Sequence, residues 1–386
     1  MQQTQTVWQR SIRHSSARSI AFFFLGYLAI GQLLSLVSIV GGFEGHADFK
    51  QLYAAAYMVR TGHAHEIYNY EATERYEREL VGNVGAILPF NHPSYEALLL
   101  APLSLFSYKT AYLLFAGVNV VLLCAIFLQL RPYLYNYVEV WPPLVFAPFF
   151  FFYPVVVCIV QGQDSLFLLA AIVCSFLLEE RRRHFLAGFV LAFGLFKFQF
   201  VIPIAVLFFL WRRWRFVAGF AAGAALWAGV SLAVTGLHSW KTYATYLLGM
   251  SAQLDARGQE MYGILPDHMA NLRGLVSVLT PAHLAAGMTL GLSLLLLIWA
   301  AGKPASFTLA TLVSVLVSYH AYRHDLTILI LPLCLAASTI QSASRIQLVS
   351  MGLIFVLPTL MMFSDLPFWL LAIPILLLTF ETAKQK

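Results

Sequence analysis

Charged side chains are scarce in this chain. Lys, Arg, Asp and Glu make up 11% of its 386 residues, and hydrophobic residues make up 60%. A soluble domain carries about 25% charged residues. Several apolar runs also approach the length that a helix needs to cross a bilayer. The composition therefore predicts an all-α polytopic membrane protein.

Several common signatures are absent from the sequence. It contains no βαβ pattern with a glycine-rich phosphate loop, which excludes the usual soluble nucleotide-sugar folds. No signal-peptide cleavage pattern is visible, so residues 20–40 are interpreted as a retained transmembrane helix. The cysteines have neither metal-ligand spacing nor the pattern of a disulfide framework, and they are interpreted as small core residues. All of them lie inside apolar segments: Cys124, Cys158, Cys174 and Cys334.

The positive charges lie mainly at the ends of apolar runs, so the net charge of +6 does not indicate nucleic acid as a partner. Arg10, Arg13 and Arg18 precede the first run, and by the positive-inside rule they place the N-terminus in the cytoplasm. Tracing the runs onward predicts a bundle of about twelve transmembrane helices with both termini cytoplasmic. This count requires that residues 94–106 do not cross fully. The whole chain, residues 1–386, is then one membrane domain with outer loops at 41–93 and 235–283.

Two arginine clusters, at residues 181–183 and 212–215, are expected on the cytoplasmic side. The segment between them is too short for two full spans, which predicts a hairpin of two short legs, or a re-entrant one, with Lys197 near the outer surface. An unpaired lysine in hydrocarbon costs about 3 kcal/mol or more, so Lys197 should face a wet or anionic cavity. Gly219 and Gly223 follow in the next run and predict close helix packing.

Asp48 begins the first large polar segment. The apolar residues after it recur on one helix face, and Gly62 provides a stop: Phe49, Leu52, Tyr53, Ala56 and Tyr57. This pattern predicts an amphipathic helix on the membrane surface with Asp48 at its N-cap. Two interpretations of Asp48 stay open. It either only caps the helix, or it is a general base at the membrane–water boundary.

Most polar residues that are not flanking anchors fall on the predicted outer face. They are Asp48, Gln161, Gln163, Asp164, Lys197, His268, Asn271, Arg273, His320, Arg323 and His324. Cations there can neutralise a phosphate leaving group, while the carboxylate takes a proton from an incoming hydroxyl. A lipid-linked sugar phosphate meets this demand, and in-line displacement with one base would invert the anomeric centre.

Two of these features have simpler readings. The turn from Gln161 to Asp164 is either part of the site or a plain helix connection in which Asp164 caps the next helix. His324 is either a functional acid, donor or phosphate partner, or an interfacial histidine in water. No further ligand stands at a recognised spacing from His63 and His65, so no metal site is expected.

The order of several loose motifs from Asp48 to about Pro332 resembles glycosyltransferase family 87. The motifs are Asp48-Phe49-x-x-x-Tyr53, Gly62 and Tyr68, the turn with Pro93, Ala101-Pro102-Leu103, Gly162-Gln163, the arginine-rich turn into Ala187-Gly188 and on to Lys197, Asn271-Leu272-Arg273-Gly274, and a late tip with His324. The family comprises membrane mannosyltransferases of the GT-C fold that use polyprenyl-phosphate-mannose. The resemblance implies a GT-C-like bundle with outer amphipathic helices and no cofactor or metal.

The resemblance further implies an inverting transfer of a sugar, mannose in this family, to an acceptor hydroxyl on the extracytoplasmic face. Asp48 would be the base, His324 the late-loop histidine and Lys197 the membrane-embedded lysine. The donor would be a polyprenyl-phosphate-sugar and the acceptor a lipid or glycan, at a bacterial inner (plasma) membrane with the site facing the periplasm or exterior. The remaining residues expected to bind substrate are Tyr53, Gln163, Asn271, Arg273 and Arg323.

The chain departs from the family pattern at the late tip. The family has Ser-Pro-x-Ser-Trp where this chain has the run Ser318-Tyr319-His320-Ala321-Tyr322. Asp325 also stands where a second histidine is common. These departures bear on acceptor and donor specificity rather than on the fold.

Two other function classes fit part of the sequence. A transporter or flippase of a lipid-linked or anionic substrate would use the outer cations as a binding site. Such a protein should carry internal repeats and paired broken helices, and no clear repeat is present. A scaffold of the cell envelope would accept any capping residue at position 48. The collection of ionisable residues on one face favours surface chemistry.

Overall fold

The computed structural model describes residues 47–82, 87–134, 149–252, 265–339 and 342–384. Within these ranges the chain forms α-helices and short 3-10 helices and no strand, which confirms the predicted all-α class. The first predicted span, residues 20–40, and the three arginines before it lie outside the described residues.

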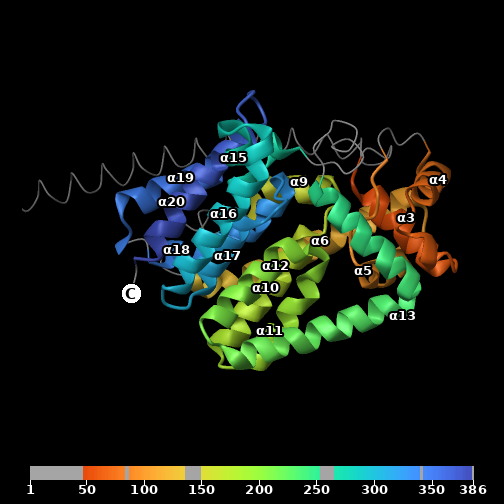
Figure 1. Ribbon diagram of the computed structural model, residues 1–386, viewed down its shortest axis with the longest axis horizontal. Helices are drawn as coiled ribbons and strands as arrows, with labels where there is room; N and C mark the ends of the chain where they lie inside the picture. The colour runs from red at the N-terminus through yellow and green to blue at the C-terminus, as the bar shows by residue number, and fades with distance from the viewer. Residues whose placement is uncertain (1–46, 83–86, 135–148, 253–264, 340–341, 385–386) are drawn as a thin grey trace, which may run out of the picture.

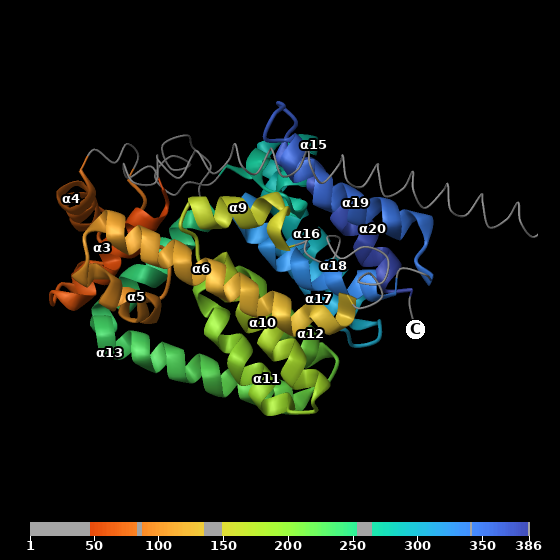
Figure 2. The ribbon, with the colours of Figure 1, turned by 180° about the vertical axis from the view of Figure 1, so that it is seen from behind.

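The helices form three neighbouring groups (Figures 1 and 2). The N-terminal group contains α3 (Phe49–Arg60), η1 (Ala64–Glu66), α4 (Tyr70–Val81), α5 (Ser94–Leu100) and η2 (Ala101–Leu105). The central group contains α6 (Tyr108–Leu130), η3 (Arg131–Leu134), α9 (Tyr153–Val160), α10 (Ser165–Glu180), α11 (His184–Leu191), η4 (Ala192–Lys197), α12 (Phe198–Leu210) and α13 (Trp214–Ala252). The C-terminal group contains η5 (Pro266–His268), α15 (Leu272–Leu279), α16 (Ala282–Ala301), α17 (Phe307–Val317), η6 (Arg323–Leu329), α18 (Ile330–Ser338), α19 (Arg345–Leu360), η8 (Phe368–Leu371) and α20 (Ala372–Thr382).

Helical segments long and apolar enough to cross a membrane mark this chain as a membrane protein. Among the described residues there are four: Tyr108–Leu134, His184–Leu210, Trp214–Leu248 and Ala282–Ala301. The segment Ser94–Leu105 is among the shorter apolar helices, in line with the expectation that it does not cross fully. The larger count of about twelve spans stays a prediction.

The predicted hairpin around Lys197 is present as a reversal of the chain within the apolar segment His184–Leu210, so this segment is not one straight span, and the place of the hairpin in the membrane stays a prediction. Its legs are α11 and α12, and Phe216 at the start of α13 touches both. The Phe216 carbonyl oxygen lies 1.9 Å from where a β-carbon on Gly188 of α11 would stand. The Phe216 ring stacks on Phe208 of α12 with centroids 3.9 Å apart. Because one residue touches both legs away from Lys197, the chain must reverse between them, at η4 and Lys197.

The predicted close packing at Gly219 and Gly223 is also confirmed. A β-carbon on Gly219 would lie 1.8 Å from the Phe185 carbonyl oxygen, and one on Gly223 would lie 2.7 Å from the Phe189 carbonyl oxygen. The long helix α13 therefore lies backbone to backbone against α11 (Figure 1). From there α13 runs past a non-helical Gly236 and packs beside α5 and η1, so it links the hairpin to the N-terminal group.

The predicted helix after Asp48 is present as α3, and its predicted place on the membrane surface stays a prediction. Most of its side chains are buried, including the polar Lys50 and Gln51. Phe49 stacks on Phe115 of α6 with ring centroids 5.0 Å apart. The apolar pattern in the sequence indicates only which side of α3 packs on the core. In the structure α3 also packs against α4, α5 and η2, and its polar side is buried as well.

The glycine contacts predict that two glycines of α13 differ in how much stability is lost when each is replaced with alanine. Gly219→Ala should lower stability by about 1–3 kcal/mol, because the new methyl group clashes with the Phe185 backbone and forces the helices apart. Gly229→Ala is the control, since a β-carbon there meets nothing within 4 Å. Thermal melts of the purified proteins in detergent test this. Equal melting temperatures for the two variants would contradict the packing.

Candidate active site

A cavity of about 190 Å³ lies where the three helix groups meet. Asp48 at the start of α3, Gln163 in the turn between α9 and α10, Lys197 at the end of η4, and His324 in η6 all line it. These are four of the residues that the sequence predicted for the site, and they come from distant parts of the chain. The structure thus brings the predicted acid and the predicted lysine into one cavity.

The turn before α10 holds Asp48 in place. The Phe49 backbone N–H donates to the Gln161 carbonyl at 3.0 Å. Gly162 has a φ of 61° and leaves room only for a hydrogen atom, because a β-carbon there would lie 2.5 Å from the Phe49 β-carbon. The next residue, Gln163, then donates from Nε2 to Asp48 Oδ2 at 2.6 Å. The turn is therefore part of the cavity wall and more than a plain connection.

Asp48 occupies the N-cap position of α3 without acting as a side-chain cap, because its carboxylate makes no capping hydrogen bond. The interpretation that it only caps the helix is therefore wrong. Burial raises the pKa of the Asp48 carboxyl above its ordinary value, while the hydrogen bond from Gln163 and the charges of Lys50 and Lys197 oppose that rise. A partly buried carboxylate with a raised pKa is suited to accept a proton.

Lys197 is buried in anionic surroundings, as predicted. Its Nζ lies 2.9 Å from Asp164 Oδ1 and 2.5 Å from Asp325 Oδ1. It also donates to Ser165 Oγ at 2.8 Å and to Gln163 Oε1 at 3.5 Å. Gln163 therefore bridges the acid Asp48 and the cation Lys197 through the two ends of one amide.

The sequence predicted one carboxylate, Asp48, acting beside several cations, and the charge balance of the cavity differs from this prediction. Asp164, for which the sequence left open a helix cap or a place in the site, makes no capping hydrogen bond and pairs with Lys197. Asp325, the departure from the family pattern, is the second partner of Lys197. Two carboxylates thus face one buried ammonium. The sequence did contain a sign of this second acid, because Asp325 stands where a histidine is common in the family.

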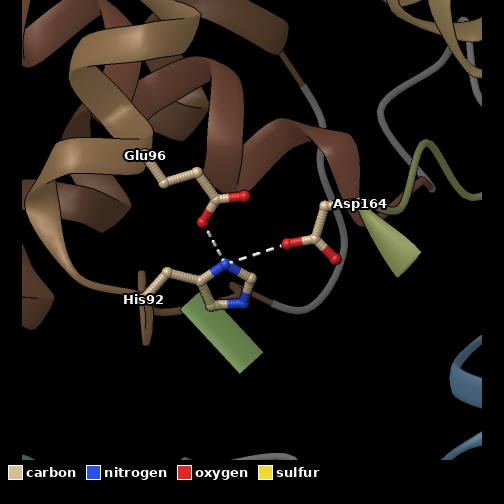
Figure 3. Close-up of side chains that lie close together, drawn as sticks. All are labelled: His92, Glu96 and Asp164. Atoms are coloured by element: carbon tan, nitrogen blue, oxygen red, sulfur yellow. Dashed lines mark hydrogen bonds and ion pairs between the residues drawn. The ribbon is translucent and has the colours of Figure 1, made fainter. Parts of the chain in front are cut away.

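Two further residues of the site were missed from the sequence, His92 and Glu96. Figure 3 shows Glu96 and Asp164 both aimed at the His92 ring. His92 Nδ1 hydrogen-bonds with Glu96 and lies 3.1 Å from Asp164 Oδ2. Burial alone would lower the pKa of His92, but the two carboxylates raise it to about 10. The signal was a histidine and a glutamate one helical turn apart, at the polar start of a short apolar run.

His324 lies in the cavity wall rather than in open water. Its Nδ1 is 3.2 Å from Gln161 Oε1, and its Nε2 is 3.5 Å from Asp325 Oδ1. Burial lowers the pKa of His324 to about 4, so the ring is neutral at pH 7. A neutral imidazole donates one hydrogen bond and accepts another, so it can orient a substrate without adding charge.

Asn271 and Arg273 lie behind the wall of the cavity, outside its lining. Asn271 caps α15 by accepting from the Gly274 N–H at 3.0 Å, and it donates to the Ser318 carbonyl at 2.6 Å. Arg273 donates to the Tyr319 carbonyl at 3.0 Å and lies 5.5 Å from the centre of the Tyr319 ring. Through these hydrogen bonds both residues hold the segment of Ser318 and Tyr319, of which Tyr319 lines the cavity. Their role in binding substrate stays a prediction.

Tyr53 and Arg323 also lie outside the cavity lining. The Tyr53 hydroxyl donates to the Phe106 carbonyl at 2.7 Å, which ties α3 to the end of η2. The Arg323 guanidinium lies 4.2 Å from the centre of the Phe368 ring. In this structure both residues connect helices, and their predicted contact with substrate likewise stays a prediction.

A sequence model of glycosyltransferase family 87 matches residues 90–319. The matched range is more than half of the chain and includes His92, the Gln163 turn and Lys197. Neither the curated proteins nor the solved structures contain a match to this chain.

The paired charges around Lys197 predict a specific pattern of stability. Lys197→Met leaves two buried carboxylates without their ammonium and should cost about 3–5 kcal/mol. The double variant Lys197→Met with Asp325→Asn removes one of the stranded charges and should recover part of that loss. Thermal unfolding in detergent compares the two. A double variant no more stable than Lys197→Met would contradict the pairing.

Proposed function

Because this chain belongs to glycosyltransferase family 87, we propose that it is an inverting transferase of a lipid-linked sugar. The donor is a polyprenyl-phosphate-sugar, with mannose as the sugar, and the acceptor is a hydroxyl of a lipid or glycan. Family membership supports glycosyl transfer by a membrane protein. The finer assignment draws its support from one observation. The Asp48 carboxylate, which does not cap its helix, lines a cavity that also contains a buried lysine.

In the proposed step, an acceptor hydroxyl oxygen attacks the anomeric carbon of the donor sugar. Its proton passes to Asp48, and the bond from the anomeric carbon to the phosphate oxygen breaks, leaving its electron pair on the phosphate. Attack opposite the leaving group inverts the anomeric centre. Gln163 holds one oxygen of the Asp48 carboxylate, which fixes the direction from which the hydroxyl must approach.

Lys197 is the proposed partner of the leaving phosphate, and it is the only Lys or Arg among the described residues that line the cavity. Its charge is held by Asp164 and Asp325 in this structure. Those carboxylates keep the ammonium fixed and buried, so a phosphate meets a positive charge of fixed position. His324 lies in the same wall as a neutral ring.

The hairpin supports the proposed orientation of the site. The arginines at residues 181–183 and 212–215 flank the far ends of its two legs, and Lys197 lies at the opposite end. By the positive-inside rule the arginine ends are cytoplasmic, so the cavity opens to the periplasm or exterior. We extend this to a single membrane domain in a bacterial inner membrane, with both termini cytoplasmic.

Replacement of the proposed base is the direct test. Asp48→Asn keeps the size of the side chain and should lower transfer from a polyprenyl-phosphate-mannose donor by about 10²- to 10⁴-fold. Asp48→Ser should also abolish transfer while preserving the fold. The readout is labelled sugar recovered on an acceptor lipid. Asp267→Asn, at an exposed outer carboxylate, should leave transfer unchanged.

Full activity in Asp48→Asn would remove the base assignment. The same assay separates transfer from transport, the alternative function. A transporter or flippase would bind the donor and leave its sugar–phosphate bond intact.

The hydrogen bond from Gln163 predicts a change in pH dependence. Gln163→Leu removes a donor that stabilises the ionised Asp48, so the pKa of Asp48 should rise further. The base is then protonated up to a higher pH, and the acidic limb of the kcat/KM profile should move to higher pH. Gln199→Leu changes the same residue type in the same cavity and should leave that limb in place. Coinciding limbs in the two variants would refute the proposed contact.

A further inference from the structure

His92, Glu96 and Asp164 form a compact cluster beside the cavity, with His92 in the cavity wall. They come from the segment before α5, from α5 itself and from the turn before α10. One ligand atom from each side chain lies within 4.8 Å of the others. Figure 3 shows that both carboxylates point at the same ring nitrogen, Nδ1 of His92. Since one nitrogen carries at most one hydrogen, it cannot donate to two carboxylates equally well.

The cluster is removed from solvent. Asp164 is 2% exposed, Glu96 6% and His92 9%. Both oxygens of Asp164 are buried, and their nearest partners are charged groups, Lys197 for Oδ1 and His92 for Oδ2.

The charge balance indicates how an ion could fit at the centre of the cluster. Glu96, Asp164 and Asp325 bring three carboxylates together, and Lys197 and the protonated His92 supply two positive charges. When the three carboxylates are ionised, one negative charge is left over. Buried charges must be compensated. A divalent cation that takes the place of the His92 proton would bring the sum to zero.

We propose that His92, Glu96 and Asp164 bind a divalent metal ion of the Mn²⁺ or Zn²⁺ class. One imidazole nitrogen with two carboxylate oxygens is a donor set that these ions accept. Metal–ligand bonds near 2.1 Å place neighbouring ligand atoms roughly 3 Å apart. The 3.1 Å between His92 Nδ1 and Asp164 Oδ2 matches that spacing, and the closer Glu96 oxygen needs only a small outward shift.

The His92 ring is already fixed for such a role. It packs against Phe90, with ring centroids 5.7 Å apart, and stacks on Phe196 at 6.4 Å. A ligand whose orientation is set before the ion arrives loses little freedom on binding. The ion would share Asp164 with Lys197, so it would also fix the position of that ammonium in the cavity. This inference does not rest on the proposed sugar transfer, because it concerns ion binding alone.

The test is a titration of the full-length protein, purified in detergent and stripped with a chelator. Mn²⁺ is the probe, and electron paramagnetic resonance measures the free ion. We expect one Mn²⁺ bound per chain, displaced by Zn²⁺. Glu96→Gln and His92→Ala should each weaken binding by at least about tenfold, because each removes one of three ligands. Glu66→Gln is the matched control, since Glu66 lies 3.5 Å from His65 in an exposed pair.

A thermal melt supplies a second readout that needs no enzymatic activity. Bound Mn²⁺ should raise the melting temperature of the wild-type protein and of Glu66→Gln but not that of Glu96→Gln. Absence of Mn²⁺ binding to the wild-type protein would overturn the proposal, whether or not the variants fold. Equal affinities of Glu96→Gln and Glu66→Gln would overturn it as well, because the ion would then lie elsewhere.

Discussion

The buried ammonium of Lys197 is the interaction on which the rest of the site depends. A lysine this deep in an apolar bundle is tolerated only beside compensating charge, and Asp164 and Asp325 provide it from two different helix groups. Each of these pairs fixes one wall of the cavity to the hairpin. Through Gln163 the same lysine is coupled to Asp48, so the acid and the cation are held as one unit. Removing the ammonium leaves both carboxylates buried without it.

Close backbone packing determines where that lysine stands. Gly188 and Gly219 let α11 and α13 meet without intervening side chains. This contact fixes the position of the hairpin, and therefore of Lys197 at its turn, relative to α13. Gly162 does the same on the opposite wall, where its positive φ turns Gln163 toward Asp48. The polar site is thus positioned by residues that carry no functional group. Helix contact in an apolar environment relies on such small residues, because the hydrophobic effect does not drive helices together there.

Part of the site was accessible from the sequence. Lys197 could be recognised because a lysine inside an apolar run is energetically costly. Asp48 could be recognised because it directly precedes an amphipathic pattern. Both residues line the cavity. Asn271 and Arg273 were equally conspicuous, yet they support the Tyr319 tip from behind. The sequence indicates which loops between helices lie on one side of the membrane. It does not indicate whether a side chain in such a loop points into the cavity or supports a neighbouring segment.

The sequence by itself determined the helical class, the membrane setting, the hairpin at Lys197 and the family, because these follow from hydropathy, charge placement and the order of motifs along the chain. Only the tertiary structure decided that Asp164 and Asp325 flank Lys197, and that His92 and Glu96 join them through Asp164, which changes an expected cationic pocket into one rich in carboxylates. Apart from His92 and Glu96, which are one helical turn apart, these residues lie far apart in sequence, and no periodicity relates them. Their partnership exists because burial forces each charge to find an opposite one, and that choice is made in three dimensions.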